Sequence, residues 1–484
     1  MHINGIDVSD LMRIKRINRR LAPTIENLVF DVPGRHGMYH IRNQLKQRRI
    51  DIDFDIIGTS TADRIEKAHA LAGILASQND LTIILPDEPQ KMYIGSLSGD
   101  TDLEEIMHLA RGTISFICSD PYALDVSTQS ASFGTSSLLT VSNTGTAETY
   151  PVFEITFNAP TTFFEIRNHS SIYPATGTPR AIMLGSAASD FEQTPVDPMT
   201  LLIHDTMGST SGWQAGVSVD GGIITGQMAS DGQRFYASDF GSGSEWHGPA
   251  LRRVLSTPVQ DFLLQARIKL NNLVGQSGRV EIYLFDVNDR AVGKIALKDN
   301  SSRAQLNTFE ARAGELTGGT YFVAEKGDTP GVWNNFDGIL ELERNGNRWR
   351  AYIAKVRPDG THYARRTRFF TDTQGLYAAQ VSSVQVHIAV GANYEPCDMS
   401  IDELRFYRIN QVQQTTQVPY IAYQGDVIQV DCGLNRVLLN GRPSNHIVAL
   451  ENHFFALEKG QNLLELFPKG ITSNVQVTWR RRWV

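Results

Sequence analysis

Residues 113–122 read Thr-Ile-Ser-Phe-Ile-Cys-Ser-Asp-Pro-Tyr, and they close the segment that decides the fold of this chain. The run from Thr113 to Cys118 alternates polar and apolar side chains, as a half-buried strand does. It follows a hairpin with many turn residues, Leu81 to Gly99, and the hairpin follows the one convincing helix of the sequence. This order of strands, helix, hairpin and strand predicts a β-rich N-terminal domain at residues 1–126.

The segments before the hairpin have two different periodicities. Residues 49–56 alternate charged and apolar side chains, the period of two that is typical of a half-buried strand. Residues 61–76 instead place Ile65, Leu71 and Leu75 on one face of a helix. Ser60 with Asp63 predicts a capped start for this helix. We therefore expect a single amphipathic helix among strands.

Composition excludes several classes of protein. The 484 residues are enough for about three domains, and the net charge of −7 argues against specific nucleic-acid binding through phosphates. Cys118, Cys397 and Cys432 are too far apart for a disulfide framework or a zinc site. Cys118 and Cys432 lie in alternating apolar runs, so core positions are expected for these two. The sequence contains no secretory signal and no run of 18 apolar residues, so we expect synthesis in the cytoplasm and no membrane span.

Two further β domains are expected after residue 126. An alternating run, Val152 to Phe157, starts the second one, but its matching end occurs only near the C-terminus. We therefore predict a discontinuous domain of residues 127–199 plus 412–484. Residues 200–411 lie between its halves and contain many short strand-like runs separated by Gly, Asn and Asp turns. This pattern predicts an inserted β-sandwich or jelly roll.

Several motifs resemble siphophage distal tail proteins, the hub rings at the tip of long non-contractile phage tails. Near the N-terminus they are Val32-Pro33-Gly34-Arg35-His36-Gly37, Pro86-Asp87-Glu88-Pro89 leading to Tyr93, Gly99, and Phe116-x-Cys118-x-Asp120-Pro121. Near the C-terminus they are Val430-Asp431, Asn440-Gly441, Leu457-Glu458-Lys459-Gly460-Gln461-Asn462 and the basic-aromatic last strand. The inserted block resembles the concanavalin-like carbohydrate-binding modules of "evolved" members of that family.

The resemblance implies a mainly β fold with three parts. These are an N-terminal β-rich domain with one α-helix, a galectin-like β-sandwich, and an inserted concanavalin-like jelly-roll β-sandwich. It also implies a homo-oligomer, a hexameric ring that joins the major tail tube protein to the tail-associated or tail fibre baseplate protein. The protein would be made in the host bacterial cytoplasm and act in the virion, at the phage tail tip.

Loop aromatic residues of the insert are the candidates for contact with host cell-wall polysaccharide. Carbohydrate sites use flat aromatic faces against sugar C–H surfaces and a few polar groups for the hydroxyls. The side chains that we predict to bind carbohydrate are Trp213, Tyr236, Trp246, His247 and Trp333. Packing in the core is the alternative role for each of them.

No catalytic motif is present, so we expect no enzyme. The one candidate for carboxylate chemistry is the pair Glu341 and Glu343, because residues two apart on a strand share a face and can flank a glycosidic bond. Leu340 and Leu342 explain the same alternation as a strand with one core face. A tail-associated glycoside hydrolase and a lectin-like adhesin that forms no ring are the alternative functions.

No cofactor is expected, with the possible exception of a structural calcium ion. Asp205 and Asp402 lie near the two ends of the insert, which adjoin in such a sandwich, and the resemblance implies that calcium is often held there. Calcium requires six to eight oxygen ligands, and these two carboxylates are the only ones with a reason to be named.

Charged runs of the N-terminal domain are the candidates for the ring interface. Arg13, Arg16 and Arg19 belong to a basic run, and Asp51, Asp53 and Asp55 form an acidic comb on one strand face. A cyclic ring joins two different surfaces of one protomer, and opposite charges there would set its register. Simple solvation of both faces is the alternative.

Overall fold

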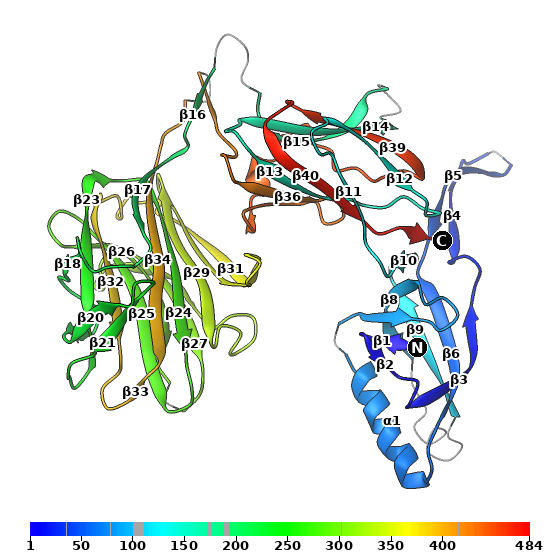
Figure 1. The fold of residues 1–484 in the computed structure, drawn as a ribbon, viewed down its shortest axis with the longest axis horizontal. Coiled ribbons are helices and arrows are strands. Elements are labelled where there is room, and N and C mark those ends of the chain that lie inside the picture. Colours follow the sequence, from blue (N-terminus) through cyan, green and yellow to red (C-terminus); the bar gives the residue numbers. More distant parts are fainter. Residues whose placement is uncertain are drawn as a thin grey trace. The chain divides into compact units, whose positions relative to one another are not determined.

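The computed structural model describes residues 1–34, 36–77, 79–99, 111–172, 177–187, 193–301, 303–413 and 416–484. Nearly all regular structure in these residues is β, and the helix α1 spans Thr61–Leu75 (Figure 1). The prediction of a mainly β fold with one helix is confirmed. Arg35, which belongs to one of the motifs quoted above, lies outside the described residues.

The chain divides into two compact units. The first contains residues 1–185, 421–439 and 443–484, and the second contains residues 186–420 and 440–442. The second unit thus includes the predicted insert, residues 200–411, together with residues on both sides of it. The cause is strand pairing at the base of the insert. There β16 (Thr194–Val196) pairs with β35 (Gln417–Pro419), and β17 (Met199–Asp205) pairs with β34 (Asp398–Ile409).

The N-terminal part of the first unit is one sheet with α1 packed against it. Ser60 Oγ accepts a hydrogen bond from the N–H of Asp63 at 3.1 Å, as the cap prediction required, and Leu71 and Leu75 are buried. The strand order is β2-β1-β7-β8-β9-β6-β3, and β10 joins β8 to β41. The bounds are β1 His2–Ile3, β2 Ile6–Asp7, β3 Met12–Arg19, β6 Arg48–Ile56, β7 Leu81–Ile84, β8 Lys91–Ser98, β9 Arg111–Cys118, β10 Ala123–Asp125 and β41 Arg482–Trp483.

The Asp-Pro-Tyr end of the opening segment ties the N-terminal sheet to the last strand of the chain. Arg482 Nη2 donates to both carboxylate oxygens of Asp120, at 2.8 and 2.9 Å. The same guanidinium lies over the ring of Tyr122, 4.1 Å from its centroid. Between these two residues, Pro121 O accepts a hydrogen bond from Arg48 Nε at 2.8 Å. Each residue of the Asp-Pro-Tyr motif thus makes a structural contact.

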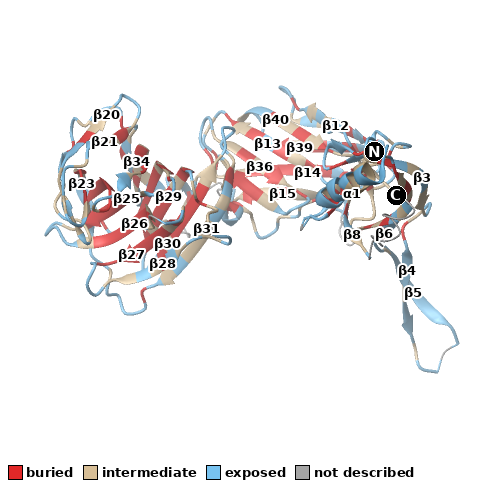
Figure 2. Ribbon diagram, turned by 90° about the horizontal axis from the view of Figure 1, so that it is seen from below, coloured by how far each residue is buried: buried red, intermediate tan, exposed pale blue. Residues whose placement is uncertain are grey.

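A separate hairpin leaves the N-terminal sheet. It consists of β4 (Ile25–Asp31) and β5 (Met38–Leu45), which pair only with each other among the described strands. Figure 2 shows it as an almost wholly exposed arm. Two strands with little buried surface are marginally stable in water by themselves, so a contact is expected to cover this hairpin.

The rest of the first unit is built from strands that come from both sides of the insert. In one sheet, β13 (Val152–Phe157) lies between β40 (Thr472–Trp479) and β36 (Val427–Asp431). Its order is β11-β40-β13-β36-β37-β38, and the second sheet has the order β12-β39-β14-β15. The other elements are β11 Gln129–Ser132, β12 Leu138–Asn143, β14 Phe163–Ile172, β15 Pro179–Gly185, β37 Arg436–Leu439, β38 Arg442–Pro443, β39 Gly460–Phe467 and the 3₁₀ turn η1 Asn445–Ile447.

The second unit is a sandwich of two eight-stranded sheets around one apolar core. The first sheet has the order β20-β21-β34-β24-β29-β30-β31 with β17 on β34, and the second has the order β18-β23-β32-β25-β26-β27-β28 with β33 on β25. Bounds in the first are β20 Gln227–Ser230, β21 Phe235–Asp239, β24 Phe262–Asn271, β29 Phe336–Asn345, β30 Arg348–Val356 and β31 His362–Thr371. Bounds in the second are β18 Gln214–Ala215, β23 Ala250–Val259, β25 Gln276–Phe285, β26 Ala291–Asp299, β27 Asn307–Ala313, β28 Thr320–Glu325, β32 Val381–Ala389 and β33 Glu395–Pro396.

Two short strands complete this unit. β19 (Gly222–Ile224) pairs in parallel with β22 (Trp246–Gly248).

All three cysteines of the chain are free and buried. The predicted core positions of Cys118 and Cys432 are confirmed, and Cys397 lies in the core of the second unit. Burial raises the pKa of Cys118 to about 11 and that of Cys397 to about 12, so both thiols stay protonated near neutral pH. The finer galectin-like and jelly-roll assignments stay predictions.

Candidate functional sites

The predicted acidic comb pairs with cationic side chains of its own chain. β3 pairs with β6 so that Arg13 lies opposite Asp55 and Arg16 lies opposite Asp53. Lys15 Nζ is 2.7 Å from Asp55 Oδ2, and Arg49 Nε is 2.7 Å from Asp51 Oδ1. The acidic comb therefore has partners on its own sheet, whereas the predicted pairing of the basic run Arg13–Arg20 with Asp51–Asp55 of the next protomer stays a prediction. The sequence could not reveal the partners within the sheet, because strand neighbours are set by tertiary pairing.

Hydroxyl groups of β9 donate hydrogen bonds to the acidic comb from the other side of β6. Ser115 Oγ donates to Asp51 Oδ1 at 2.6 Å, and Thr113 Oγ1 donates to Asp53 Oδ1 at 2.7 Å. Burial opposes ionisation of Asp51, but the bonds from Ser115 and Arg49 prevail and lower its pKa. Arg19 points elsewhere, toward Asp87 at 2.9 Å and Glu88 at 3.1 Å. The comb is thus a satisfied strand face.

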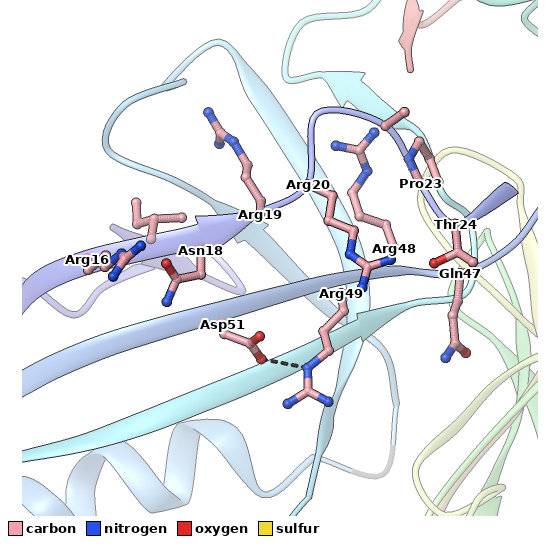
Figure 3. A pocket seen from close by; sticks show the side chains of 12 residues that line it. Arg16, Asn18, Arg19, Arg20, Pro23, Thr24, Gln47, Arg48, Arg49 and Asp51 are labelled. Carbon is pink, nitrogen blue, oxygen red and sulfur yellow. Dashed lines mark hydrogen bonds and ion pairs between the residues drawn. The ribbon is translucent and has the colours of Figure 1, made fainter.

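An arginine-lined pocket lies where β3 ends and β6 begins. Its volume is about 720 Å³, and Figure 3 shows the side chains that surround it. Asp51 is the single acidic residue of the lining. The five arginines of the lining are Arg16, Arg19, Arg20, Arg48 and Arg49. The segment after β3 closes the pocket with Pro23 and Thr24 and then continues into β4.

The exposed hairpin beside this pocket has an apolar surface. Phe30 and Tyr39 are cross-strand partners, and their exposed fractions are 57% and 50%. Ile41 and Met38 on β5 are more exposed still, and Leu21 in the segment before β4 is 97% exposed. Contiguous exposed apolar residues on one element mark an interaction surface.

The second sheet of the insert has a row of polar side chains on the face opposite the core. Strand register places Tyr283 of β25 between Gln385 of β32 and Lys294 of β26, and Arg312 of β27 and Tyr321 of β28 follow. We call these five residues the polar row. Glu281 and His387 form a second cross-strand pair next to it, and His387 Nδ1 is 2.8 Å from Glu281 Oε2.

Charges in this face are buried and paired. Lys294 Nζ lies 2.9 Å from Glu281 Oε1, and neither side chain is more than 3% exposed. Burial alone would raise the pKa of Glu281, but the charges of Lys294 and Arg279 hold it well below its ordinary value. Burial likewise opposes the charge on Lys294, yet Glu281 and Asp220 raise the pKa of its ammonium group. Both groups are therefore ionised in the folded state at neutral pH.

Residues 217–222, which we call the strap, cross the polar row. The N–H of Val217 donates to Gln385 Oε1 at 2.7 Å, and Gln385 Nε2 donates to Ser218 O at 2.7 Å. Asp220 accepts from Arg312 Nη1 at 2.5 Å and is 3.0 Å from Lys294 Nζ. The strap therefore lies over the row from Gln385 to Arg312, whereas Tyr321 at the end of the row is 43% exposed.

Two aromatic rings stack on arginine side chains next to the strap. The guanidinium of Arg279 lies 4.8 Å from the ring centroid of half-buried Trp246. The guanidinium of Arg312 lies 5.2 Å from the ring centroid of Tyr321, which is 43% exposed. Both arginines are themselves buried, so each ring has a rigid polar support. Of the predicted carbohydrate residues, Trp246 is the one that the structure places in this setting.

Two of the predicted sugar contacts are core residues instead. Trp333 is 1% exposed, its Nε1 donates to Ala364 O at 2.7 Å, and its ring packs edge-on against Phe309. Trp213 is 9% exposed and packs edge-on against Phe235. A buried indole has no free face for a sugar, so these two predictions are corrected.

Of the remaining two predicted contacts, His247 is buried and Tyr236 is half-buried. His247 is 7% exposed, its Nδ1 is 2.8 Å from Glu245 O, and its backbone bridges to Val390. Tyr236 lies half-buried on β21, which belongs to the first sheet of the sandwich. Tyr236 and Trp246 are therefore on different sheets, and the structure does not join the five predicted residues into one platform.

Sequence reasoning missed Arg279, Lys294 and Arg312. The signal available for them was a charged residue at every second position of an otherwise apolar strand, as in Arg279-Val-Glu281-Ile-Tyr283. That pattern is also typical of an ordinary solvated face, so it could not identify a buried one.

The proposed calcium ligands do not fit a cation site. Asp205 accepts hydrogen bonds from the N–H of Met207 and from Trp213 Nε1, and it pairs with Arg253. Asp402 accepts from Ser400 Oγ and lies 3.3 Å from Lys269 Nζ. Cationic side chains thus occupy the places of a metal ion, and no group of three or more His, Cys, Asp or Glu among the described residues could hold one.

Glu341 and Glu343 share one cation. Arg350 Nη1 lies 3.0 Å from Glu341 Oε2, and Arg350 Nη2 lies 2.6 Å from Glu343 Oε2. Burial opposes the charge of Arg350, but the two carboxylates raise the pKa of its guanidinium. Both carboxylates of the predicted pair are thus engaged in ion pairs with one guanidinium group.

Acidification is expected to destabilise the insert through His362. This imidazole is 6% exposed, its Nδ1 is 2.8 Å from the hydroxyl of Tyr352, and burial lowers its pKa to about 4. The unfolded chain binds this proton near pH 6.5, so the stabilisation is complete above that pH and is lost as the pH falls toward 4, by at most about 3 kcal/mol. Urea unfolding between pH 7 and 4 would measure it. His362→Gln should show a shallower pH dependence, and equal slopes would contradict the prediction.

Two segments match families of phage tail proteins. Residues 6–118 match the family described as phage tail protein RIFT-related domain, and residues 398–483 match the siphovirus-type tail component, C-terminal domain. The distal tail protein of Bacillus phage SPP1 is 26% identical over 170 residues, which are 34% of this chain and 66% of that protein. The resemblance to siphophage distal tail proteins is confirmed. The chain is thus a component of a siphophage tail.

The match to distal tail proteins covers the two ends of the chain. It includes the β3–β6 face, the hairpin and the arginine-lined pocket, whereas residues 119–397 lie outside both family matches. The chain spans 66% of the length of the curated relative from phage SPP1. No helix among the described residues is long and apolar enough to cross a membrane.

Solved structures with similar folds include two from tail proteins. One is the CBM2 module of the evolved Dit of Lactobacillus casei BL23 phage J-1, with 14% identity, a TM-score of 0.39, and coverage of 45% of this chain and 99% of that chain. The other is the SPP1 Dit protein, with 20% identity, a TM-score of 0.32, and coverage of 38% and 73%.

Proposed function

We propose that this chain forms the hexameric hub ring of a siphophage tail tip and joins the tail tube to the baseplate proteins. The exposed apolar hairpin β4–β5, which lies within the segment that matches phage tail proteins, carries this proposal. A closed ring joins one surface of each protomer to a different surface of the next. The hairpin supplies the first surface, because its apolar residues are uncovered in the single chain.

The double variant Phe30→Asp/Tyr39→Asp is expected to abolish ring assembly without unfolding the chain. Both side chains are at least half exposed, so they add little to the stability of the protomer. In the ring the neighbouring protomer would bury both aromatic side chains, so their removal weakens association by roughly 100-fold or more. Sedimentation velocity and negative-stain microscopy measure the result. Val287→Asp, at a position 70% exposed in the insert, is the matched control. Rings formed by the double variant would contradict the role of the hairpin.

The insert is proposed to bind host cell-wall saccharides during adsorption. Trp246 supports this proposal, because an accessible indole on a buried arginine offers a flat, rigid face to sugar C–H groups. Tyr321 on Arg312 adds a second such ring, and the two supporting arginines, Arg279 and Arg312, belong to the same sheet. A shallow site of this kind binds weakly by itself, and display around a ring raises the apparent affinity by about 10²–10⁴.

Trp246→Ala is expected to weaken binding to purified cell-wall polysaccharide of a susceptible host by roughly tenfold, because the stacking face is removed. Pull-down of the full chain with insoluble wall material measures the bound fraction. Tyr363→Ala is the matched control, because Tyr363 is an exposed ring on an arginine, Arg357, but belongs to the first sheet. An equal decrease in both variants would contradict a site at Trp246.

No hydrolysis of the polysaccharide is expected, and the chain is proposed not to be an enzyme. The bridge from Arg350 to Glu341 and Glu343 supports this proposal, since the carboxylates of the candidate catalytic pair are held by an arginine of their own sheet. Release of reducing sugar by the full chain would favour the alternative of a tail-associated glycoside hydrolase.

A further inference from the structure

The arginine-lined pocket between β3 and β6 contains more cationic groups than its own chain neutralises. Arg19 pairs with Asp87 and Glu88, and Arg49 pairs with Asp51. No carboxylate of the described residues pairs with the other three arginines of the lining, Arg16, Arg20 and Arg48. Like charges that share one concave surface repel each other, so a bound anion would stabilise them.

Arg48 gives the strongest indication that the pocket is built for a ligand. Arg48 is only 5% exposed. Its Nε donates a hydrogen bond to Pro121 O at 2.8 Å, and its guanidinium group lies over the ring of Tyr93. Its Nη2 is buried and makes no hydrogen bond to any described residue. A buried charged donor without an acceptor is costly, and an anion in the pocket would supply the missing acceptor.

The surroundings of the pocket distinguish between classes of anion. Leu21 follows Arg20 directly and is 97% exposed, and Ile25 follows the lining residue Thr24 and is 52% exposed. A nucleic-acid backbone has no aliphatic surface that would cover these side chains, and the net charge of −7 disfavours a long polyanion. A polypeptide segment supplies carboxylates and aliphatic side chains together. Guanidinium groups bind carboxylates with two parallel hydrogen bonds, which adds geometric specificity.

We propose that this pocket is a docking site for an acidic segment of a partner protein, whose carboxylates bind Arg16, Arg20 and Arg48 while an aliphatic side chain beside them covers Leu21. This site is distinct from the ring contact of the hairpin, and peptide binding to it does not require a ring. It would attach a second protein of the tail at the base of each hairpin.

Fluorescence anisotropy with the full chain tests the proposal. The probe is a labelled ten-residue peptide in which Asp and Glu alternate with Leu, and its matched control has Asn and Gln at the acidic positions. We expect the acidic peptide to bind and the amide peptide to bind at least tenfold more weakly, with affinity for the acidic peptide falling as salt rises. A labelled DNA duplex of the same length is the third probe and should bind more weakly than the acidic peptide.

Variants of exposed arginines identify the pocket without disturbing the fold. Arg16→Gln/Arg20→Gln should weaken peptide binding by roughly 100-fold, about tenfold for each charge-assisted hydrogen bond that the substitution removes. Arg13→Gln is the matched control, because Arg13 is an exposed arginine of β3 that does not line the pocket. Arg48→Lys keeps the charge but removes the planar fork of donors, and a folded Arg48→Lys protein should also bind more weakly.

Three results would overturn the proposal: equal binding of the acidic and amide peptides, an equal decrease in Arg13→Gln and in the double variant, or preferential binding of the duplex. Sedimentation of the same samples shows whether rings assemble, so a failure of the pocket proposal can be distinguished from a failure of the hub proposal. Ring assembly by a chain that binds no peptide would reject the pocket alone, and peptide binding by a chain that forms no ring would reject the hub alone.

Discussion

Lys294→Met is expected to lower the free energy of unfolding of the second unit by about 3–5 kcal/mol, because removal of one partner leaves a buried charge uncompensated. Lys294 is 2% exposed and lies 2.9 Å from Glu281 Oε1 and 3.0 Å from Asp220 Oδ2. Without this ammonium group, Glu281 would keep Arg279, His387 and the hydroxyl of Tyr283 as partners. Methionine has a similar volume, so the change removes charge rather than packing.

Urea denaturation of the full chain, with the transition of the second unit followed separately, measures this decrease in stability. Lys298→Met is the matched control on the same strand, because Lys298 pairs with Glu310 but is 19% exposed in its side chain. Its effect is expected to be under about 1 kcal/mol. If the two variants unfold at the same urea concentration, the ion pairs of Lys294 with Glu281 and Asp220 do not stabilise the second unit as described. Removal of the Lys294 charge should also release Asp220 and increase protease cleavage within the strap, residues 217–222.

Trp333→Ala is expected to cost about 3–5 kcal/mol of stability, since it removes a fully buried indole and leaves a cavity. The ring packs against Phe309 at 5.8 Å, and its Nε1 donates to Ala364 O, so the carbonyl would also be left without its donor. Thermal and urea unfolding measure the effect. Below its unfolding temperature the variant should bind polysaccharide as the parent does, because no face of Trp333 is accessible.

Trp246→Ala should give the opposite result. Its half-exposed ring stacks on Arg279, and removal of that stacking costs about 1 kcal/mol of stability. Polysaccharide binding should fall while the fold persists. If Trp333→Ala reduced binding of a stably folded chain, the assignment of Trp333 to the core would be wrong.

Local sequence patterns predicted the elements of the first unit well. The alternation in residues 49–56 and 113–118 corresponds to β6 and β9, and the segment from Leu81 to Gly99 forms β7 and β8. The helix begins at Thr61 behind its Ser60 cap, as predicted. These features depend on neighbours in the chain: a period of two or 3.6 residues, a capping hydroxyl, a proline at a turn.

Partners across strands were not predictable in the same way. Arg13 and Asp55 are far apart in sequence and became neighbours only when β3 paired with β6. Trp246 and Trp333 both lie close to glycines in loop-like sequence, yet Trp246 is half-buried and Trp333 is fully buried against Phe309. Local sequence does not record what covers a residue.

The sequence alone thus determined that the chain is mainly β, where its one helix starts, that Cys118 and Cys432 belong to cores, and that its two ends resemble distal tail proteins. Only the tertiary structure decided that the acidic comb has partners on its own sheet, that Arg48 lines a pocket while its Nη2 is buried without an acceptor among the described residues, and that the strap covers most of the polar row. The physical reason is that strand periodicity specifies which side chains share a face, whereas the energy of a charge depends on what packs against that face.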